Sequence, residues 1–188
     1  FIDAGVSDML EGCVRTYVAQ SATRHGISKD STFESAINSA WIVSQYENEY
    51  NPSHTHTGCE ISSVLYLKVP DVKGRRKIPS KKGKVDHDGD IIFPYSSESQ
   101  RTGELLTKGV LQIPPHRGMM LIFPAWLLHG VYPFVGEGER RSIAFNANYM
   151  IHTPKDKNGE FEWIGGSSKN VQHKYAYWDK TKIEGETK

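Results

Sequence analysis

The first regular pattern in the chain is helical. Between residues 3 and 24, apolar side chains recur at spacings of three and four, as expected for one face of a helix. They are Val6, Met9, Leu10, Cys13, Val14, Tyr17 and Val18. Gly26 then provides a stop signal. We expect an amphipathic helix here that packs outside the rest of the fold. Capping residues in segment 30–34 favour a further short helical turn.

From residue 40 the pattern changes to short runs of β-branched and aromatic residues separated by turn clusters. We predict strands at 40–46, 60–69, 90–95, 110–113, 119–123, 131–134, 142–150 and 161–164. Strands at such near-regular spacing indicate a β sandwich or barrel. Strands alternating with helices, as in a parallel α/β sheet, are not seen.

The length of 188 residues predicts a single domain, 1–188, with a substantial core. We divide it into helical support (1–39), a β core (40–165) and a C-terminal tail (166–188). Two segments interrupt the strands. Residues 73–84 carry seven basic side chains and are interpreted either as a solvated loop or as an anion-binding or substrate-gripping lid. The polar segment 96–108 is expected to be a surface loop.

Charge and composition narrow the choice of partners and compartment. The formal net charge of +1 gives no reason to expect nucleic acid or an anionic membrane as a partner. No apolar run approaches the ~20 residues that span a bilayer. No signal peptide is visible, although the sequence begins at Phe1 without a methionine. Two cysteines fit free thiols in a reducing cytoplasm, and one bridge stays possible.

Three histidines are candidates for a metal site. His54 and His56 are two apart before a predicted strand, and side chains at i and i+2 of extended chain share one face. Neutral imidazole binds iron, zinc, copper or nickel. His129 follows a very apolar segment and, if buried, needs a partner. It is either a third ligand or a core histidine bonded to a carbonyl, and the first pair alone also fits a surface.

A second constellation predicts an anion site. Arg140, Ser142 and Asn146 share one side of a predicted strand. An arginine that points into a barrel carries a costly buried charge, which a bound carboxylate would compensate. Its fork of donors matches two carboxylate oxygens. Alternatively, Arg140 or Arg141 simply pairs at the surface with the loop 135–139.

These segments resemble the 2-oxoglutarate/Fe(II)-dependent oxygenases, and within them a small branch of marine bacteria and phages. The motifs that carry the resemblance lie between residues 40 and 150. They are His54-Thr-His56, Ser62-Ser-Val-Leu-Tyr-Leu67, Phe123-Pro-Ala-Trp-Leu-Leu-His129-Gly-Val-Tyr-Pro133 and Arg140-Arg-Ser-Ile-Ala-Phe-Asn146. The resemblance implies a mainly β fold, a double-stranded β-helix (jelly roll, cupin-like), with Fe(II) in its mouth.

The resemblance also implies roles for individual residues. His54 and His129 match two iron ligands, and His56 stands where the superfamily usually has an acid. Arg140, assisted by Ser142, matches the clamp on the distal carboxylate of 2-oxoglutarate, and Tyr66 donates to the same carboxylate. Glu60 is an alternative ligand to His56; Asp86 and Asp88 are further candidates. No catalytic residue beyond the metal ligands is assigned.

The function that follows is hydroxylation of an unknown small molecule or peptide, using Fe(II), 2-oxoglutarate and O2 and releasing succinate and CO2. Trp41, Tyr46 and Trp126 are candidate walls for the substrate, or core residues. One alternative is another cupin-type metal protein that uses His54, His56, Glu60 and His129. Another is a non-enzymatic jelly roll with incidental histidines.

Overall fold

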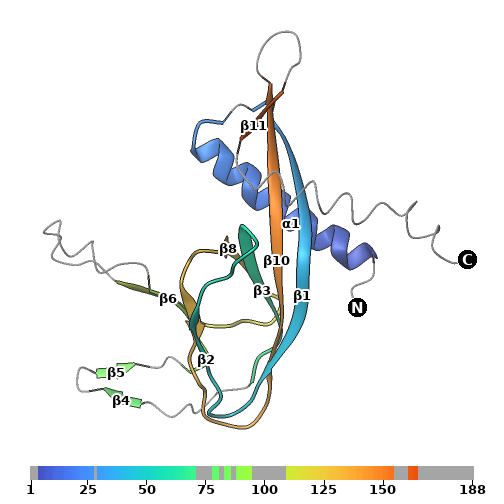
Figure 1. Ribbon diagram of the computed structural model, residues 1–188. Helices are drawn as coiled ribbons and strands as arrows, with labels where there is room; N and C mark the ends of the chain where they lie inside the picture. Colours follow the sequence, from blue (N-terminus) through green and yellow to red (C-terminus); the bar gives the residue numbers. More distant parts are fainter. Residues whose placement is uncertain are drawn as a thin grey trace, which may run out of the picture. The chain divides into compact units, whose positions relative to one another are not determined.

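The computed structural model describes residues 4–27, 29–70, 78–80, 83–85, 88–94, 109–154 and 161–164. Within these ranges the chain forms one helix followed by strands (Figure 1). In order they are α1 (Ala4–Arg24), β1 (Thr32–Gln45), β2 (Asn51–His54), β3 (Ile61–Lys68), β4 (Ile78–Ser80), β5 (Gly83–Val85), β6 (Ile91–Pro94), β7 (Val110–Ile113), β8 (Met120–Pro124), β9 (His129–Val131), β10 (Arg140–Pro154) and β11 (Phe161–Ile164).

The strands form two main sheets. One has the order β1-β10-β3-β8, with β11 pairing with β10, and the other has the order β2-β9-β6-β7. Strands that follow one another in the sequence therefore mostly alternate between the sheets, which is the winding of a jelly roll. The remaining short strands, β4 and β5, pair with each other. The prediction of a mainly β, cupin-like double-stranded β-helix with an N-terminal helix is confirmed.

The chain divides into two compact units. The first contains Phe1–Ala40, Gly58–Ser62 and Phe145–Lys188; the second contains Trp41–Thr57 and Ser63–Ala144. The second unit holds the whole β2-β9-β6-β7 sheet. Its apolar core consists of Val64, Tyr66, Ile91, Phe93, Phe123 and Val131, which come from both sheets. The prediction of a single domain over 1–188 stays a prediction.

In the first unit, α1 packs on the N-terminal half of β1. Its buried side chains are Leu10, Val14, Val18 and Ala22, spaced by four along one face. Glu11 fixes the helix to the strand, because its side chain accepts a bond from the Ile37 N–H (3.1 Å) and its carbonyl accepts one from the Ser35 hydroxyl (2.9 Å). The helix ends as expected: Gly26 has φ +75°, and the Ile27 N–H bonds to the Ala22 carbonyl (3.0 Å).

Three sequence predictions about local structure need correction. Strand β1 begins at Thr32, earlier than the predicted start at residue 40, so residues 30–34 do not form the expected helical turn. The strand expected at 131–134 is β9, at His129–Val131. Strand β2 was not predicted, because Asn-Pro-Ser-His contains no β-branched or aromatic residue.

Some predictions fall outside the described residues. They concern the loop 96–108, the tail 166–188, Asp86, and the basic segment 73–84 apart from the backbone of β4 and β5. Among the described helices, none is both long and apolar enough to cross a membrane.

Candidate metal centre and buried arginine

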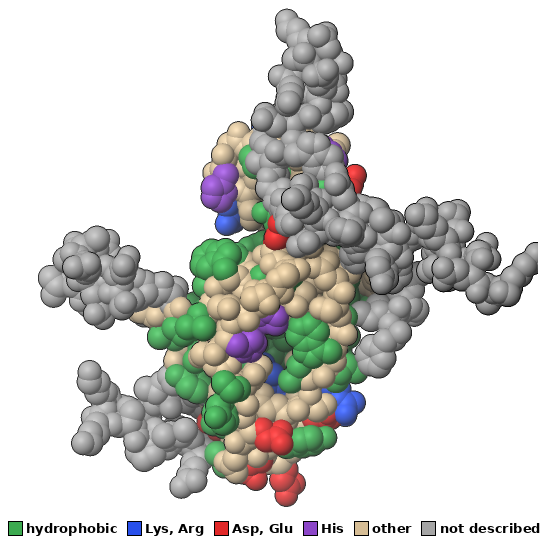
Figure 2. All heavy atoms as spheres, in the orientation of Figure 1, with side chains coloured by type: hydrophobic (Ala, Val, Ile, Leu, Met, Phe, Trp, Pro, Cys, Tyr) green, Lys and Arg blue, Asp and Glu red, His purple; other side chains and the backbone are tan. Residues whose placement is uncertain are grey.

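The three predicted histidines lie together in the second unit. His54 and His129 are direct partners across the β2–β9 ladder, and their ring centroids are 4.4 Å apart. His56 follows the end of β2, where its backbone N–H bonds to the Ala125 carbonyl (2.9 Å). One nitrogen from each ring lies within 4.8 Å of the others. Figure 2 shows histidine side chains near the centre of one face, beside hydrophobic ones.

Main-chain carbonyls orient two of these rings. The Nδ1 atoms of His54 and His129 lie 2.7 Å and 2.9 Å from the carbonyl oxygens of Pro52 and Leu127. A carbonyl can only accept, so each Nδ1 carries the proton and each Nε2 presents a lone pair. Histidine ligands of metals are oriented by this kind of outer hydrogen bond.

The spacing of one pair of nitrogens fits a shared ion. The Nε2 atoms of His56 and His129 are 3.3 Å apart. Two nitrogens that bind one ion at about 2.0–2.1 Å, at angles of about 90–110°, lie about 2.8–3.4 Å apart. Burial, together with the nearby His54 and His56, lowers the pKa of His129 to about 4 despite the opposing effect of the bond to Leu127. His129 is therefore neutral at physiological pH, as a metal ligand must be.

Strands β2 and β9 approach each other closely at this point. A Cβ atom added to Gly130 would lie 3.0 Å from both the Asn51 carbonyl oxygen and the Ser53 Oγ. The position therefore has no room for a side chain. Phe123 packs edge-on against His129, with ring centroids 4.7 Å apart, and Trp41 stacks on His56 at 5.9 Å. Of the other predicted walls, Trp126 and Tyr46 are 73% and 51% exposed.

The carboxylates considered as alternative ligands are not in this cluster. Within the described part of the chain, the only group that can hold a metal consists of the three histidines. Glu60 belongs to the first unit, where it accepts a bond from the Tyr149 N–H (3.2 Å). Asp88 is buried and accepts a bond from the Val135 N–H (3.3 Å).

Arg140 is the largest fully buried side chain of the described residues, at 2% exposure. Its Nη2 donates to the Tyr66 hydroxyl (3.2 Å), and its Nη1 lies 3.4 Å from the Gln45 Oε1. Its guanidinium carbon lies 4.8 Å from the centre of the Tyr66 ring. Its Nε is buried without a partner, and no ion pair joins it to a carboxylate within the described ranges.

The environment of Arg140 disfavours its charge. Burial lowers the pKa of Arg140, and Tyr66 partly opposes this. Guanidinium stays protonated in proteins, so the second unit contains a buried positive charge, and no described carboxylate forms an ion pair with it. The same unit also contains two buried carboxylates, Asp88 and Asp90. Burial also raises the pKa of Tyr66, which keeps its hydroxyl protonated.

Ser142, which is 1% exposed, follows two residues later on the inner face of β10. Asn146 lies farther along the same strand but belongs to the first unit; its Oδ1 is buried and has no partner among the described residues. The sequence did not single out Gln45. Gln45 follows Val43 by two residues and Trp41 by four, so the three share the inner face of β1. This alternation was the signal that could have identified Gln45.

Comparisons with known proteins agree with this chemistry. Residues 39–146 match the family described as "Putative 2OG-Fe(II) oxygenase". No curated protein matches the chain in sequence.

Several solved structures resemble the fold. One is an oxidoreductase of the 2OG-Fe(II) oxygenase family from Burkholderia pseudomallei, at 14% identity and a TM-score of 0.42, covering 61% of this chain and 43% of that one. Another is HygX from Streptomyces hygroscopicus with iron bound, at 13% and 0.39, covering 71% and 67%. A third is an RmlC-like cupin from Desulfovibrio desulfuricans, at 17% and 0.31, covering 61% and 79%.

The chain thus spans less than half the length of the Burkholderia oxygenase. The family match itself extends over more than half of this chain and contains all three histidines, Arg140 and Tyr66. The family's cofactors are Fe(II) and 2-oxoglutarate, and its members are oxygenases. The chain belongs to this family of 2-oxoglutarate/Fe(II) oxygenases.

Proposed function

We propose that the chain hydroxylates an organic substrate, using Fe(II) held by His54, His56 and His129 and 2-oxoglutarate held by Arg140. When bound, the iron and 2-oxoglutarate supply the activation of O2, with release of succinate and CO2 and insertion of oxygen into a C–H bond. The observation that carries the proposal is the combination, in one unit, of three clustered imidazoles and a buried arginine that forms no ion pair with a described residue.

The histidines act by orientation. The Nδ1 atoms of His54 and His129 donate to the carbonyls of Pro52 and Leu127, which leaves the Nε2 atom of each ring with a free lone pair. The Nε2 atoms of His56 and His129 lie 3.3 Å apart, so both nitrogens border the same space. Phe123 and Phe93 shield His129 from water on the core side.

Arg140 and its neighbours supply the anion site. The unpartnered Nε and the Nη groups offer donors to the distal carboxylate of 2-oxoglutarate. Tyr66 accepts a bond from Arg140 and still has its own proton to donate to that carboxylate. Ser142 offers a hydroxyl from the same face of β10. Asn146 is kept as a further candidate for this site.

Succinate formation tests the proposal. Purified protein supplied with Fe(II), 2-oxoglutarate, ascorbate and O2 should release succinate even without a substrate, because uncoupled turnover needs only the iron and the 2-oxoglutarate. Arg140→Met should abolish this release at low 2-oxoglutarate concentration. If the wild-type protein neither binds 2-oxoglutarate nor forms succinate, the proposal is wrong and the 2-oxoglutarate-independent cupin is the better hypothesis.

A separate comparison tests the ligand set. His56→Ala should weaken Fe(II) or Ni(II) binding, measured by calorimetric titration, whereas Glu60→Gln should leave it unchanged. The reason is that Glu60 is in the first unit and bonds to the backbone of Tyr149. Loss of metal binding in the Glu60 variant, with retention in the His56 variant, would replace the three-histidine assignment with one that includes the carboxylate.

Several finer assignments accompany this proposal. We assign the chain to the branch with His-x-His and Phe-Pro-Ser-Trp-Leu-x-His motifs on the basis of residues 54–56 and 123–129. A small molecule or peptide is proposed as substrate, rather than nucleic acid. A cytoplasmic location is proposed because Cys13 and Cys59 are both free thiols.

A further inference from the structure

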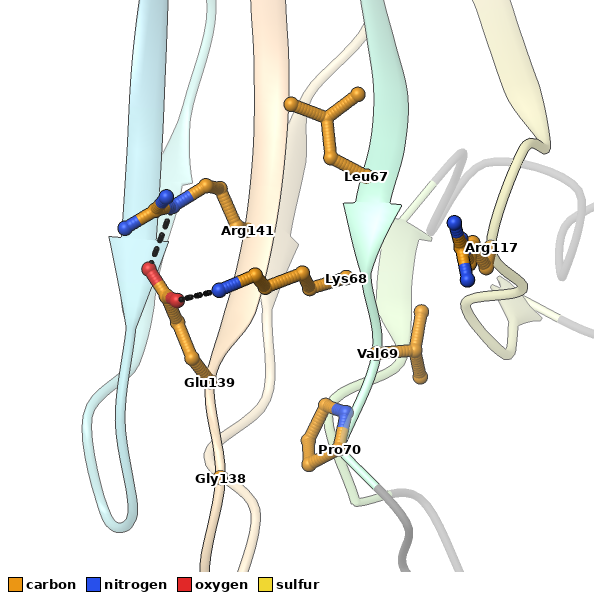
Figure 3. A pocket seen from close by; sticks show the side chains of 8 residues that line it. All are labelled: Leu67, Lys68, Val69, Pro70, Arg117, Gly138, Glu139 and Arg141. Atoms are coloured by element: carbon orange, nitrogen blue, oxygen red, sulfur yellow. Dashed lines mark hydrogen bonds and ion pairs between the residues drawn. The ribbon is translucent and has the colours of Figure 1, made fainter.

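A groove of the second unit is lined by residues other than the three histidines and Arg140. It has a volume of about 590 Å³ and lies beside the end of β3 and the start of β10 (Figure 3). Leu67, Val69 and Pro70 give it an apolar wall. At Gly138, which has φ +116°, an added Cβ would lie 3.1 Å from Pro70 Cβ, so the two segments touch at this side of the groove. A volume of this size is in the range of ligand sites.

The charges around the groove are unbalanced. Lys68, Arg117 and Arg141 line it together with a single carboxylate, Glu139. That carboxylate is used twice: Lys68 Nζ lies 3.1 Å from one oxygen and Arg141 Nε lies 2.6 Å from the other. These bonds lower the pKa of Glu139, together with a hydrogen bond involving Ser44, which is the largest contribution.

Arg117 is held on the other side of β3. Its turn is fixed by the Gly118 N–H, which bonds to the Tyr66 carbonyl at 2.8 Å. Figure 3 shows Arg117 across β3 from the Lys68–Glu139–Arg141 cluster. Arg117 forms no ion pair with any described residue. The groove therefore has one excess cation on each side, in a chain whose overall net charge is only +1.

The apolar wall restricts the kind of anion. Single-stranded nucleic acid is usually held by aromatic side chains on which bases stack. Among the described residues that line the groove, none is aromatic. Leu67, Val69 and Pro70 instead offer contacts to aliphatic side chains. The sequence continues from Pro70 toward the basic segment 73–84, whose charge has the same sign.

We propose that this groove binds an acidic peptide segment of a partner protein. Carboxylates of the peptide pair with Arg117 on one side and with Lys68 and Arg141 on the other, and its aliphatic side chains cover Leu67, Val69 and Pro70. The peptide competes with Glu139 for Lys68 and Arg141. This site is independent of the proposed oxygenase chemistry, since none of its residues is assigned to iron or 2-oxoglutarate.

Fluorescence polarisation with a dye-labelled peptide of alternating glutamate and leucine tests the proposal on the full chain. The matched control peptide has glutamine in place of each glutamate. The acidic peptide should bind and the control should not, and binding should weaken as salt increases, because exposed ion pairs are screened. Equal binding of both peptides, or binding that salt does not affect, overturns the proposal.

Two variants with opposite expected effects locate the site. Arg117→Ser should raise the Kd about three- to five-fold, the range of an exposed ion pair. Glu139→Gln should lower the Kd about three-fold, because it releases Lys68 and Arg141 for the peptide. Arg24→Ser, an exposed arginine at the end of α1, is the control and should change nothing.

Two further outcomes would contradict the proposed peptide site. If neither Arg117→Ser nor Glu139→Gln changes the Kd, the peptide binds elsewhere and the groove is not its site. If a labelled single-stranded RNA binds better than the peptide and responds to the same variants, the groove is an anion site but the peptide assignment is wrong. Succinate release should be unchanged in all three variants, so failure here does not touch the proposed oxygenase function.

Discussion

The two faces of β10 place adjacent arginines in opposite environments. Arg140, on the inner face, is 2% exposed, and its guanidinium donates to the uncharged side chains of Gln45 and Tyr66. Arg141, on the outer face, is partly exposed, and its Nε donates to Glu139 at 2.6 Å and lies 3.2 Å from the Ser44 Oγ. The outer arginine thus forms an ion pair within the chain, whereas the inner one forms none with the described residues.

The difference is between an arginine that is neutralised by an ion pair, Arg141, and one that we propose is neutralised by a bound ligand, Arg140. A buried charge without a partner is strongly unfavourable. The 2-oxoglutarate proposed above would supply the opposite charge when bound. The surface pair of Arg141 and Glu139 needs no ligand to explain it, because its two charges already neutralise each other. Exposed ion pairs of this kind contribute little to stability.

The largest effect is expected for the inner face of β9. His129→Ala removes the most buried of the three imidazoles and should weaken Fe(II) or Ni(II) binding by about 100-fold or more, because loss of an outer-shell partner alone costs about 10–100-fold. Calorimetric titration with Ni(II) would measure this. Metal affinity that persists in this variant would mean that His129 is a core histidine, satisfied by Leu127 alone.

Arg140→Met gives the next largest effect and has two readouts. The Kd for 2-oxoglutarate should rise about 100-fold, because truncating one partner of a buried charge pair costs about 2–5 kcal/mol. The melting temperature without 2-oxoglutarate should not fall, because an apolar side chain of similar length replaces an uncompensated charge. A lower melting temperature with unchanged 2-oxoglutarate binding would make Arg140 a structural residue.

Tyr66→Phe should have a smaller effect at the same site. The phenylalanine ring keeps its position under the guanidinium but lacks the oxygen that lies 3.2 Å from Nη2. Loss of one hydrogen bond corresponds to about a five-fold rise in the Kd for 2-oxoglutarate. Titration of the variant at constant metal concentration measures it. An unchanged Kd would show that the hydroxyl does not reach the ligand.

The smallest effect is expected on the outer face. Arg141→Ala should change the Kd for 2-oxoglutarate less than two-fold and the free energy of unfolding by less than about 0.5 kcal/mol, as for most surface substitutions. Chemical denaturation and the same titration provide both values. A large loss of 2-oxoglutarate binding here, without one in Arg140→Met, would reverse the assignment of the two faces.

The sequence was a better guide to chemistry than to the limits of strands. Residue type and spacing singled out the three histidines, and the resemblance to the oxygenases singled out Arg140. The structure brings the histidines together and buries Arg140, whereas their roles stay predictions. Strand β2, which carries His54, was missed because its four residues have low β propensity and depend on pairing with β9. The choice between Arg140 and Arg141 was equally hard to make from alternation, since residues on both sides of the strand, such as Ala144 and Phe145, are apolar.

Other features depend on contacts between segments far apart in the sequence. Gln45 contacts Arg140 across 95 positions, and His56 meets His129 across 73. No local pattern reveals such pairs. The assignment of Glu60 to a different unit from His56, only four positions earlier, likewise follows from the fold rather than from spacing.

The carbonyls that orient His54 and His129 each come from the residue two positions earlier. Every amino acid contributes the same carbonyl, so substitutions at Pro52 or Leu127 change a side chain but not the acceptor. The orientation of these two imidazoles is thus insensitive to which side chain stands at position 52 or 127. The orientation of these two rings therefore depends on the backbone conformation around residues 52–54 and 127–129 rather than on the side chains at positions 52 and 127.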